Sequence, residues 1–359
     1  MADTALCVGL AVSLENPPQK SERSTCDRRS IVNPAAGRLR PIAGLVLATV
    51  VSVSVAQTPP LPRIGWVISG TAENTRHTVQ AVRAGLADEG LVDGRSVILD
   101  VRFTAGRPER YPEIFADLTR QPVAVLAAAG FAGISAARDA SAGRTPISAY
   151  FCGSEVQRMV ESFARPAGNV TGVSCLSSEL AIKRVELLKL SVPSLRHLGF
   201  LYDPRNPGKE RELAEVRQGA AGLGVSVSAA AASSAEALRE AIASLRRDGA
   251  EAVVISEDVF TYGNREAIVA LTAEHRMVDI SSFREFVDAG GVLSYGASNM
   301  ERMRMQARYA AKLVRGAKPS DLPIDQPTRF EFVINLKAAR ALGITLPKAV
   351  LARANEVIE

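Results

Sequence analysis

The sequence has few of the residues that build metal centres. Its 359 residues include only four cysteines and three histidines, which lie far apart along the chain: Cys7, Cys26, Cys152, Cys175, His77, His197 and His275. No two cysteines have CxxC spacing, and no group of His and Cys has the spacing of a zinc site. We therefore expect no metal site.

Aromatic and clustered basic residues are also scarce. Aromatic residues make up 5% of the chain, which argues against a surface that stacks single-stranded nucleic acid. The formal net charge is +5, but the basic residues form no long run that could follow a phosphate backbone. We expect no nucleic-acid partner. The 47% hydrophobic content and the length predict a globular chain of two domains.

The motifs of common catalytic sites are absent from the sequence. There is no GxxxxGK[ST] loop for nucleotide phosphates and no GxSxG turn for a nucleophilic serine. The stretch 128–133 has two glycines after a predicted strand, but it lacks the full GxGxxG of a dinucleotide site. The three histidines fit structural or solvated positions. We predict no catalytic residue, no cofactor and no enzymatic activity.

Residues 1–56 have the pattern of an export signal. The apolar stretch 41–55 follows two arginines and leads to Ala56 in a small-x-small cleavage site. It is shorter than the roughly 20 residues of a spanning helix, and prolines follow it at once, so a cleaved signal is favoured over an anchor. Residues 1–37 are polar and aperiodic, and we interpret them as disordered or as lying upstream of the true start. A long leader or a signal-anchor tail is the alternative.

After the leader, short β-rich apolar runs alternate with amphipathic helical patterns, which predicts an α/β fold with parallel sheets. The first series has strands at 63–69, 96–103, 123–129 and 146–151, and helices at 75–89, 107–120 and 130–142. The second series has helices at 178–190, 207–223, 235–247 and 264–276, and strands at 197–203, 225–231, 252–256 and 278–282. Then follow the segment 290–296, a helix at 299–315, a proline-rich link at 317–327, a strand at 330–336 and terminal helical turns. Two similar series predict two lobes of one architecture.

Candidate ligand-binding residues lie at the predicted carboxyl ends of the strands, where open α/β sheets bind ligands. They are Ser69, Thr71, Gly130, Tyr150, Phe151, Gly153, Ser154, Asp203, Asn206, Asp258, Ser282 and Tyr295. Several precede a helix amino terminus, whose free N–H groups favour an anion, so a small molecule with a carboxylate fits the pattern. The same residue types also cap helices and form turns, and that alternative stays open for each single residue.

Six segments together resemble a known family, and they include YDPRNPG (202–208) and FREFVDAGGVLSYG (283–296). The other four are 85–128, 165–174, 179–189 and 327–347. They resemble the substrate-binding proteins of ABC importers, in the subgroup that contains tryptophan- and tyrosine-binding proteins. The resemblance covers about residues 62–358. It implies a type I periplasmic-binding-protein fold, with two doubly wound lobes joined by a three-crossing hinge that closes on a small ligand.

The resemblance also implies limits for the two lobes. The crossings fall near Gly172, near Phe283 and within the link 317–327, which becomes a hinge strand. Lobe one then takes residues 62–172 and 283–318, and lobe two takes residues 173–282 and 319–359.

At one point the sequence departs from its relatives. They often carry Gly-Gly-Asp after the fourth strand of lobe one, and this chain has Cys152-Gly153-Ser154 there. The missing carboxylate puts an identical ligand in doubt. After loss of the leader, Cys152 and Cys175 are the cysteines that stay in the chain, and they either form a disulfide or remain two thiols.

The function that the resemblance implies is that of a monomeric periplasmic receptor. It would capture a small organic solute, an amino acid or an aromatic carboxylate, and deliver it to an ABC permease in the inner membrane. Ser69, Thr71, Gly130 and the amides of Gly153 and Ser154 would hold the anionic group; Tyr150, Phe151 or Tyr295 would line an apolar wall; and Asp203, Asn206 or Asp258 would meet an amine or hydroxyl. Two alternatives stay open: a periplasmic sensor for a membrane signalling receptor, and an α/β enzyme that uses Glu257 and Asp258.

Overall fold

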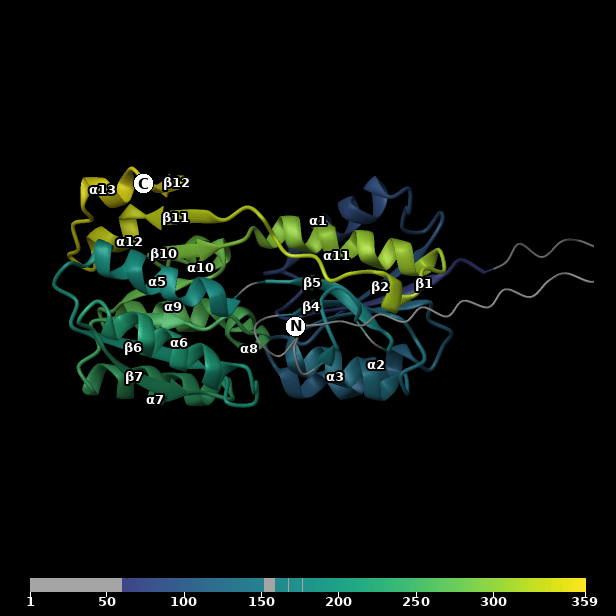
Figure 1. Cartoon of the computed structure of the whole chain (residues 1–359), viewed down its shortest axis with the longest axis horizontal. Helices are drawn as coiled ribbons and strands as arrows, with labels where there is room; N and C mark the ends of the chain where they lie inside the picture. Colours follow the sequence, from purple (N-terminus) through teal and green to yellow (C-terminus); the bar gives the residue numbers. More distant parts are fainter. Residues whose placement is uncertain (1–59, 152–158, 167, 176) are drawn as a thin grey trace, which may run out of the picture. The chain divides into compact units, whose positions relative to one another are not determined.

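The computed structural model describes residues 60–151, 159–166, 168–175 and 177–359 (Figure 1). The predicted leader with its cleavage site lies outside these residues, as do Cys152, Gly153 and Ser154. Residues Thr58–Glu359 form one compact unit, in which the strands form two sheets with helices packed on them. Within the described ranges, no helix has the length and apolar character that a bilayer crossing requires.

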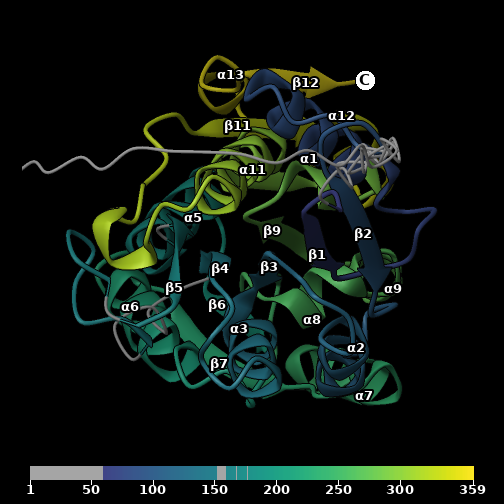
Figure 2. The same ribbon diagram turned by 90° about the vertical axis from the view of Figure 1, so that its right-hand side faces the viewer.

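The first sheet has five parallel strands in the order β2-β1-β3-β4-β5. Its strands are β1 (Arg63–Ile68), β2 (Ile98–Phe103), β3 (Val125–Ala129), β4 (Ile147–Phe151) and β5 (Val170–Ser174). The helical elements packed with it are α1 (Arg76–Asp88), η1 (Pro108–Arg110), α2 (Tyr111–Leu118), α3 (Gly130–Ala140) and α11 (Asn299–Val314). Helices α1 and α11 lie on one face of the sheet, and α2 and α3 lie on the other (Figure 2).

The side chains of β1 show why this sheet is covered on both faces. Ile64 and Trp66 are buried in the core that includes Leu86 of α1. Val67, one position on, is buried in a separate core with Phe115 of α2. Successive side chains of a strand point to opposite faces, so a continuous apolar run gives a strand buried on both sides.

The second sheet has the order β12-β11-β10-β9-β8-β6-β7. Its strands are β6 (His197–Tyr202), β7 (Ser226–Ala231), β8 (Ala252–Ile255), β9 (Val278–Ser281), β10 (Leu293–Gly296), β11 (Glu331–Asn335) and β12 (Glu356–Ile358). The pairing is parallel except between β10 and β11. The helices of this half are α5 (Ser177–Ser191), α6 (Lys209–Ala221), α7 (Ala235–Arg247), α8 (Val259–Gly263), α9 (Arg265–Glu274), α10 (Arg284–Asp288), α12 (Leu336–Ala341) and α13 (Lys348–Leu351). Helices α5 and α6 pack together, as do α7 and α9.

The predicted α/β class with two doubly wound halves is confirmed by this topology. The predicted helix 235–247 coincides with α7, and the predicted strand 63–69 differs from β1 by one residue. Four elements were not predicted from the sequence: β5, β12 and the short helices α8 and α10. Strand β5 reads VTGVS, and a stretch this short with a central glycine gives no alternating apolar signal.

The predicted second crossing near Phe283 is wrong. It would place residues 283–296 in the first lobe, but β10 pairs with β9 through Leu293 and Ile280 in the second sheet. Val292 and Leu293 are buried in the core of that sheet. The chain therefore returns to the first sheet only after Gly296, where α11 begins.

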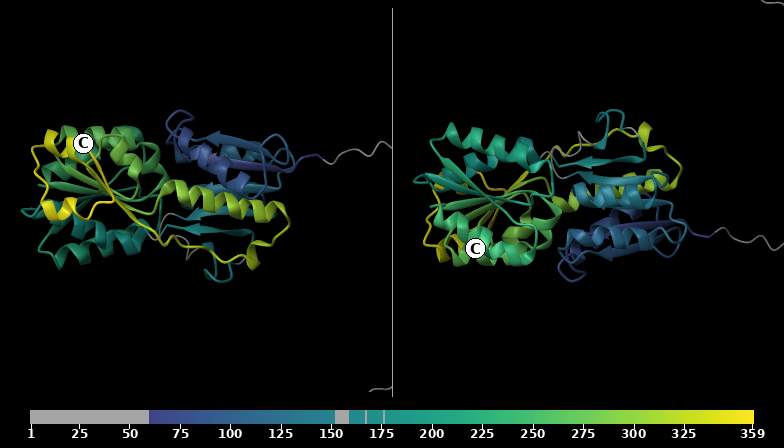
Figure 3. Two further views of the ribbon diagram at one scale, coloured as in Figure 1. Left: turned by 90° about the horizontal axis from the view of Figure 1, so that it is seen from above. Right: turned by 90° about the horizontal axis from the view of Figure 1, so that it is seen from below.

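The first and third passages between the sheets run side by side. Ser174 N donates to Asp325 O at 2.9 Å, and Asp325 N donates to Gly172 O at 3.0 Å. The link that contains Asp325 follows the turn η2 (Pro319–Asp321) and runs from the first sheet towards β11 (Figure 3). This pairing lies where the sequence predicts a hinge strand; the remaining lobe limits and the hinge motion stay predictions.

Candidate functional site

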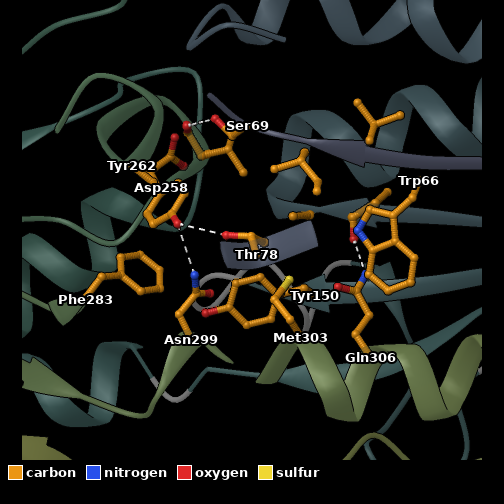
Figure 4. Close-up of a pocket in the computed structure, with 15 residues that line it drawn as sticks. Trp66, Ser69, Thr78, Tyr150, Asp258, Tyr262, Phe283, Asn299, Met303 and Gln306 are labelled. Carbon is orange, nitrogen blue, oxygen red and sulfur yellow. Dashed lines mark hydrogen bonds between the residues drawn. The ribbon is translucent and has the colours of Figure 1, made fainter. Parts of the chain in front are cut away.

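A cavity lies between the two halves, at the carboxyl ends of β1, β3, β4 and β8 (Figure 4). We call it the inner cavity, and its lining includes Trp66, Ser69, Thr78, Tyr150, Asp258, Tyr262, Phe283, Asn299, Met303 and Gln306. Its volume is about 50 Å³. That is room for a few water molecules, whereas organic ligands occupy pockets of roughly 300 Å³ or more. A ligand of that size requires the walls of the cavity to move apart.

A hydrogen-bonded group of polar side chains lines one side of the inner cavity. The Tyr262 hydroxyl accepts from Asn299 Nδ2 at 3.1 Å and lies 3.4 Å from Thr78 Oγ1 (Figure 4). Asn299 Nδ2 also donates to Glu285 Oε1 at 2.9 Å. Burial, together with the charge of Glu285, raises the pKa of the Tyr262 phenol. Tyr262 therefore stays neutral and acts as a hydrogen-bonding group between the halves.

Beside the inner cavity, a buried carboxylate joins the two halves. Glu257 Oε1 accepts from the Tyr150 hydroxyl at 2.5 Å and from Arg302 Nη1 at 3.0 Å. Its Oε2 lies 3.6 Å from Arg184 Nη2. Burial raises the pKa of Glu257, but attraction by Arg302 and Arg184 and the Tyr150 hydrogen bond outweigh it and hold the pKa below its ordinary value. Glu257 is therefore a charged bridge rather than a proton donor.

The other buried cations of this region are bound within the second half. Lys209 Nζ donates to Glu212 Oε2 at 2.8 Å and also to the Glu257 carbonyl oxygen. Arg184 Nε donates to the Tyr295 carbonyl oxygen at 2.9 Å. These contacts place two cations behind Glu257, where burial without partners would cost several kcal/mol.

Asp258 lies on the wall that the inner cavity shares with a second pocket. This second pocket, of about 200 Å³, is lined by Pro108, Glu109, Ala132, Asp203, Arg205, Asn206, Asp258 and Val259, and we call it the acidic pocket. Asp258 caps α8 by accepting from Phe260 N at 2.8 Å, and it accepts from Asn206 Nδ2 at 2.7 Å. Burial raises the pKa of Asp258, Lys209 opposes that rise, and Asp203 adds to it.

Three of the predicted site residues line the inner cavity, namely Ser69, Tyr150 and Asp258. The Ser69 hydroxyl donates to the Val259 carbonyl oxygen of the other half. Gly130, with φ of +64°, begins α3 directly beside the Val259 side chain. Thr71 instead pairs locally with Asn74, whose side chain accepts from Thr71 N at 2.8 Å.

Other predicted residues lie elsewhere. Of the three alternatives for an apolar wall, Tyr150 lines this cavity, whereas Phe151 is buried in the core with α2 and α3 and is not among the lining residues. Tyr295 is not on that wall either, because its ring lies against Phe330 and Phe332. Ser282 lines a separate small pocket, Asp203 and Asn206 line the acidic pocket, and Gly153 and Ser154 lie outside the described residues.

Helix α11 contributes three residues to the inner cavity that were not predicted from the sequence. Asn299, Met303 and Gln306 follow one another at spacings of four and three residues, so they share one helix face. Gln306 Nε2 donates to the carbonyl oxygens of Ala128 at 3.1 Å and Ser148 at 2.8 Å, which holds α11 on the first sheet. The spacing was visible in the sequence, but the sequence does not show which face of α11 is turned towards the cavity.

A metal site was not expected. Across the part of the chain that the structure describes, no three His, Cys, Asp or Glu side chains come together as metal ligands. Cys175 is buried at the end of β5. Both alternatives for Cys152 and Cys175, a disulfide or two thiols, stay predictions, because Cys152 is outside the described residues.

Comparison with known proteins gives one family and a set of similar folds. A family model described as ABC transporter substrate binding protein matches residues 64–358. No relative among the curated proteins matches the chain.

Several solved structures have a similar fold. A conserved domain protein from Vibrio cholerae is 22% identical with a TM-score of 0.76, and the match covers 83% of this chain and 100% of that one. An ABC domain in complex with L-Trp from Streptococcus pneumoniae is 22% identical with a TM-score of 0.74, over 83% and 100%. A 5-methylthioribose transporter solute binding protein from Thermotoga lettingae, in complex with 5-methylthioribose, is 15% identical with a TM-score of 0.53, over 82% and 98%. At these identities the likeness concerns the fold.

Proposed function

Because the chain belongs to the family of ABC transporter substrate binding proteins, we propose that it is the solute receptor of an importer. In this proposal it captures a small organic molecule between its two halves and delivers it to a permease in the membrane. The family is one of ligand-binding transport proteins, and we propose no reaction. The predicted signal peptide and periplasmic location belong to the same proposal.

The observation that carries the proposal is the origin of the walls of the inner cavity. Trp66 and Tyr150 come from the first sheet, and Asp258 and Tyr262 come from the second half. Apolar walls with a few convergent polar groups are typical of small-molecule sites. A site divided between two halves couples ligand binding to their closure. One chain supplies both walls, so a monomer is sufficient.

The solute class is a further part of the proposal. The sequence favours an amino acid or an aromatic carboxylate. The aromatic rings of Trp66, Tyr150, Tyr262 and Phe283 around the inner cavity support a solute with an apolar or aromatic part. A protein of similar fold was solved in complex with L-Trp, which is an aromatic solute of the class proposed here.

Trp66 provides a direct test. It is the single tryptophan of the chain, and it lines the inner cavity, so its fluorescence reports on that site. We expect a saturable change in fluorescence when the purified protein is titrated with a panel of amino acids, amines and aromatic acids. Calorimetry should give one ligand per chain, and ligand at 100 times its Kd should stabilise the fold by about 2.7 kcal/mol.

The control is Trp66→Phe, which should lose the fluorescence signal and keep a calorimetric signal.

Deletion of the gene in its bacterium should abolish high-affinity uptake of the identified ligand, whereas a sensor would leave uptake unchanged. If no small molecule changes the fluorescence or the melting temperature, the receptor assignment is rejected.

A further inference from the structure

We propose that the solute is a ring-bearing organic cation, an amine without a carboxylate, whose protonated nitrogen is bound by Asp258. This inference rests on the proposed function and narrows it. It departs from the amino acid or aromatic carboxylate that the sequence favours. Three features of the described residues support it: the bonding of Asp258, the aromatic lining and the charge of the acidic pocket.

Asp258 retains capacity for a further donor. The residue is buried, with 3% of its surface exposed, and each carboxylate oxygen accepts from one described partner, Oδ1 from Phe260 N and Oδ2 from Asn206 Nδ2. A carboxylate has about four acceptor positions, so a third donor can bind without displacing these two. Because burial raises the pKa of this carboxyl, a cationic partner would stabilise its charged form.

The aromatic side chains of the inner cavity suit a cation as well as an apolar ring. The electron-rich faces of Trp, Tyr and Phe attract cations within about 6 Å. The protein already uses two of these rings in this way, because the Arg302 guanidinium lies 5.0 Å from the Tyr150 ring centre and 4.7 Å from that of Phe283. An ammonium group at Asp258 would lie on the wall of the same aromatic cavity.

The acidic pocket has an excess of negative charge. Glu109, Asp203 and Asp258 line it, against one cation, Arg205. Arg205 is itself bound to Asp203, with Nε to Oδ1 at 2.9 Å and Nη2 to Oδ2 at 2.8 Å. A negative field at a pocket raises the local concentration of cations and disfavours anions. The acidic pocket borders Asp258, so a cation near it is already beside the proposed partner.

A carboxylate finds less support at this site. Among the described residues that line the inner cavity there is no lysine or arginine. The arginines that contact its aromatic rings are engaged elsewhere: Arg302 with Glu257 at 3.0 Å, and Arg265 with the carbonyl oxygens of Tyr262 at 3.0 Å and Asn74 at 2.6 Å.

The first experiment compares ligands that share a ring and differ in charge. Each series has an amine, its amino acid and its carboxylic acid: phenethylamine, phenylalanine and phenylacetate; tryptamine, tryptophan and indole-3-acetate; cyclohexylethylamine, cyclohexylalanine and cyclohexylacetate. We expect at least one amine to bind, at least tenfold more tightly than its amino acid, with no binding by the corresponding acid.

The outcomes separate this inference from the proposed function. If an amino acid or acid binds as tightly as its amine or more tightly, the inference is overturned and the receptor function stands. If no amine binds while the wider panel yields another ligand, the inference is overturned in the same way. If nothing binds in any series or in the panel, the receptor function fails as well.

The second experiment removes the charge of Asp258. Asp258→Asn retains an oxygen that can cap α8, and we expect the amine to bind about 10- to 100-fold more weakly, since a charge-assisted hydrogen bond is lost. The alcohol analogue of the same amine should bind equally to both proteins.

The matched control is Asp279→Asn, which alters a buried carboxyl of β9 away from the inner cavity and should leave amine affinity unchanged. If Asp258→Asn fails to fold, Asp258→Ser, another capping residue, replaces it. An unchanged amine affinity in a folded Asp258 variant overturns the inference.

Discussion

Glu257 and Arg302 form a buried ion pair between the two halves of the protein. Their Oε1 and Nη1 atoms lie 3.0 Å apart, and both side chains are about 1% exposed. Glu257 follows β8 of the second sheet, and Arg302 belongs to α11, which packs on the first. The Tyr150 hydroxyl adds a second bond from the first sheet to the same carboxylate oxygen. The two halves therefore meet at a buried charge that is neutralised across their boundary.

We expect Glu257→Gln to destabilise the fold by about 3–5 kcal/mol, because it removes the negative charge that faces the buried Arg302 guanidinium. Urea unfolding measures this loss. The control is Glu274→Gln, which removes an exposed partner of Arg239 and should cost under about 1 kcal/mol. Similar losses in both variants would show that the buried pair adds nothing beyond an ordinary surface pair.

Asp279 should make the stability of the protein depend on pH. Its Oδ1 accepts from Val292 N at 3.0 Å, and burial raises its pKa to about 7. The pKa in the unfolded chain is about 3.9. The folded state therefore binds the proton more tightly than the unfolded chain does. The contribution of Asp279 to the unfolding free energy is fully present below pH 4 and is lost as the pH rises through 7.

Asp279→Asn removes that titration and keeps an acceptor for Val292 N. Between pH 5 and pH 8, the wild type should lose about 3 kcal/mol of unfolding free energy relative to the variant. The loss accumulates over the roughly two pH units from pH 5 to the folded-state pKa of about 7, and each unit corresponds to about 1.4 kcal/mol. Urea unfolding of both proteins at the two pH values gives the difference. An equal pH dependence in the two proteins contradicts this assignment.

Gly172 is required in the middle of β5, the strand from which the first passage between the sheets departs. Its φ is +147°, and a Cβ atom there would overlap the backbone carbonyl oxygen of Ala149 in β4. We expect Gly172→Ala to separate β5 from β4 and to cost more than about 3 kcal/mol in urea unfolding. Gly224→Ala is the control: its φ is +68° and no atom lies within 4 Å of the added methyl, so strain of about 1–2 kcal/mol is expected. Equal losses of unfolding free energy in the two variants would show that the overlap with the Ala149 carbonyl oxygen does not destabilise the fold.

The fold was predictable because its signals are local. The run 123–129 is apolar throughout and became a central strand, and the periodic stretch 235–247 became α7. A buried strand and an amphipathic helix each carry their pattern within one segment. The second crossing was not predictable in this way, because the place of Leu293 in the second sheet depends on its pairing with Ile280, which no local pattern records.

The candidate site was predictable only where a strand ends at the inner cavity. Tyr150 lines the inner cavity, whereas Phe151, the next residue of β4, points to the opposite face and packs in the core with α2 and α3. Met303 could not be assigned before the packing of α11 showed which face of this helix is turned to the inner cavity. Sequence patterns identify which segments approach the site, whereas the choice of side chain depends on the face that tertiary packing turns inward.

The close packing of α1 against α11 gives a last prediction about the walls of the inner cavity. A Cβ atom at Gly85 of α1 would lie 2.8 Å from both the Cα and the carbonyl oxygen of Arg304 in α11. Ala favours a helix over Gly by about 1 kcal/mol. The Arg304 backbone atoms, unlike a side chain, cannot rotate away from the added methyl group, and overpacking of this kind costs about 1–3 kcal/mol. We therefore expect Gly85→Ala to destabilise the protein and to shift Trp66 fluorescence, since both helices line the inner cavity.

Gly219→Ala in α6 is the matched control, because the atoms nearest to its methyl group belong to the flexible Ile182 side chain, at 3.0 Å. That variant should keep or raise the unfolding free energy and leave the fluorescence unchanged; a stabilised Gly85→Ala protein would show instead that α1 and α11 can separate at no cost.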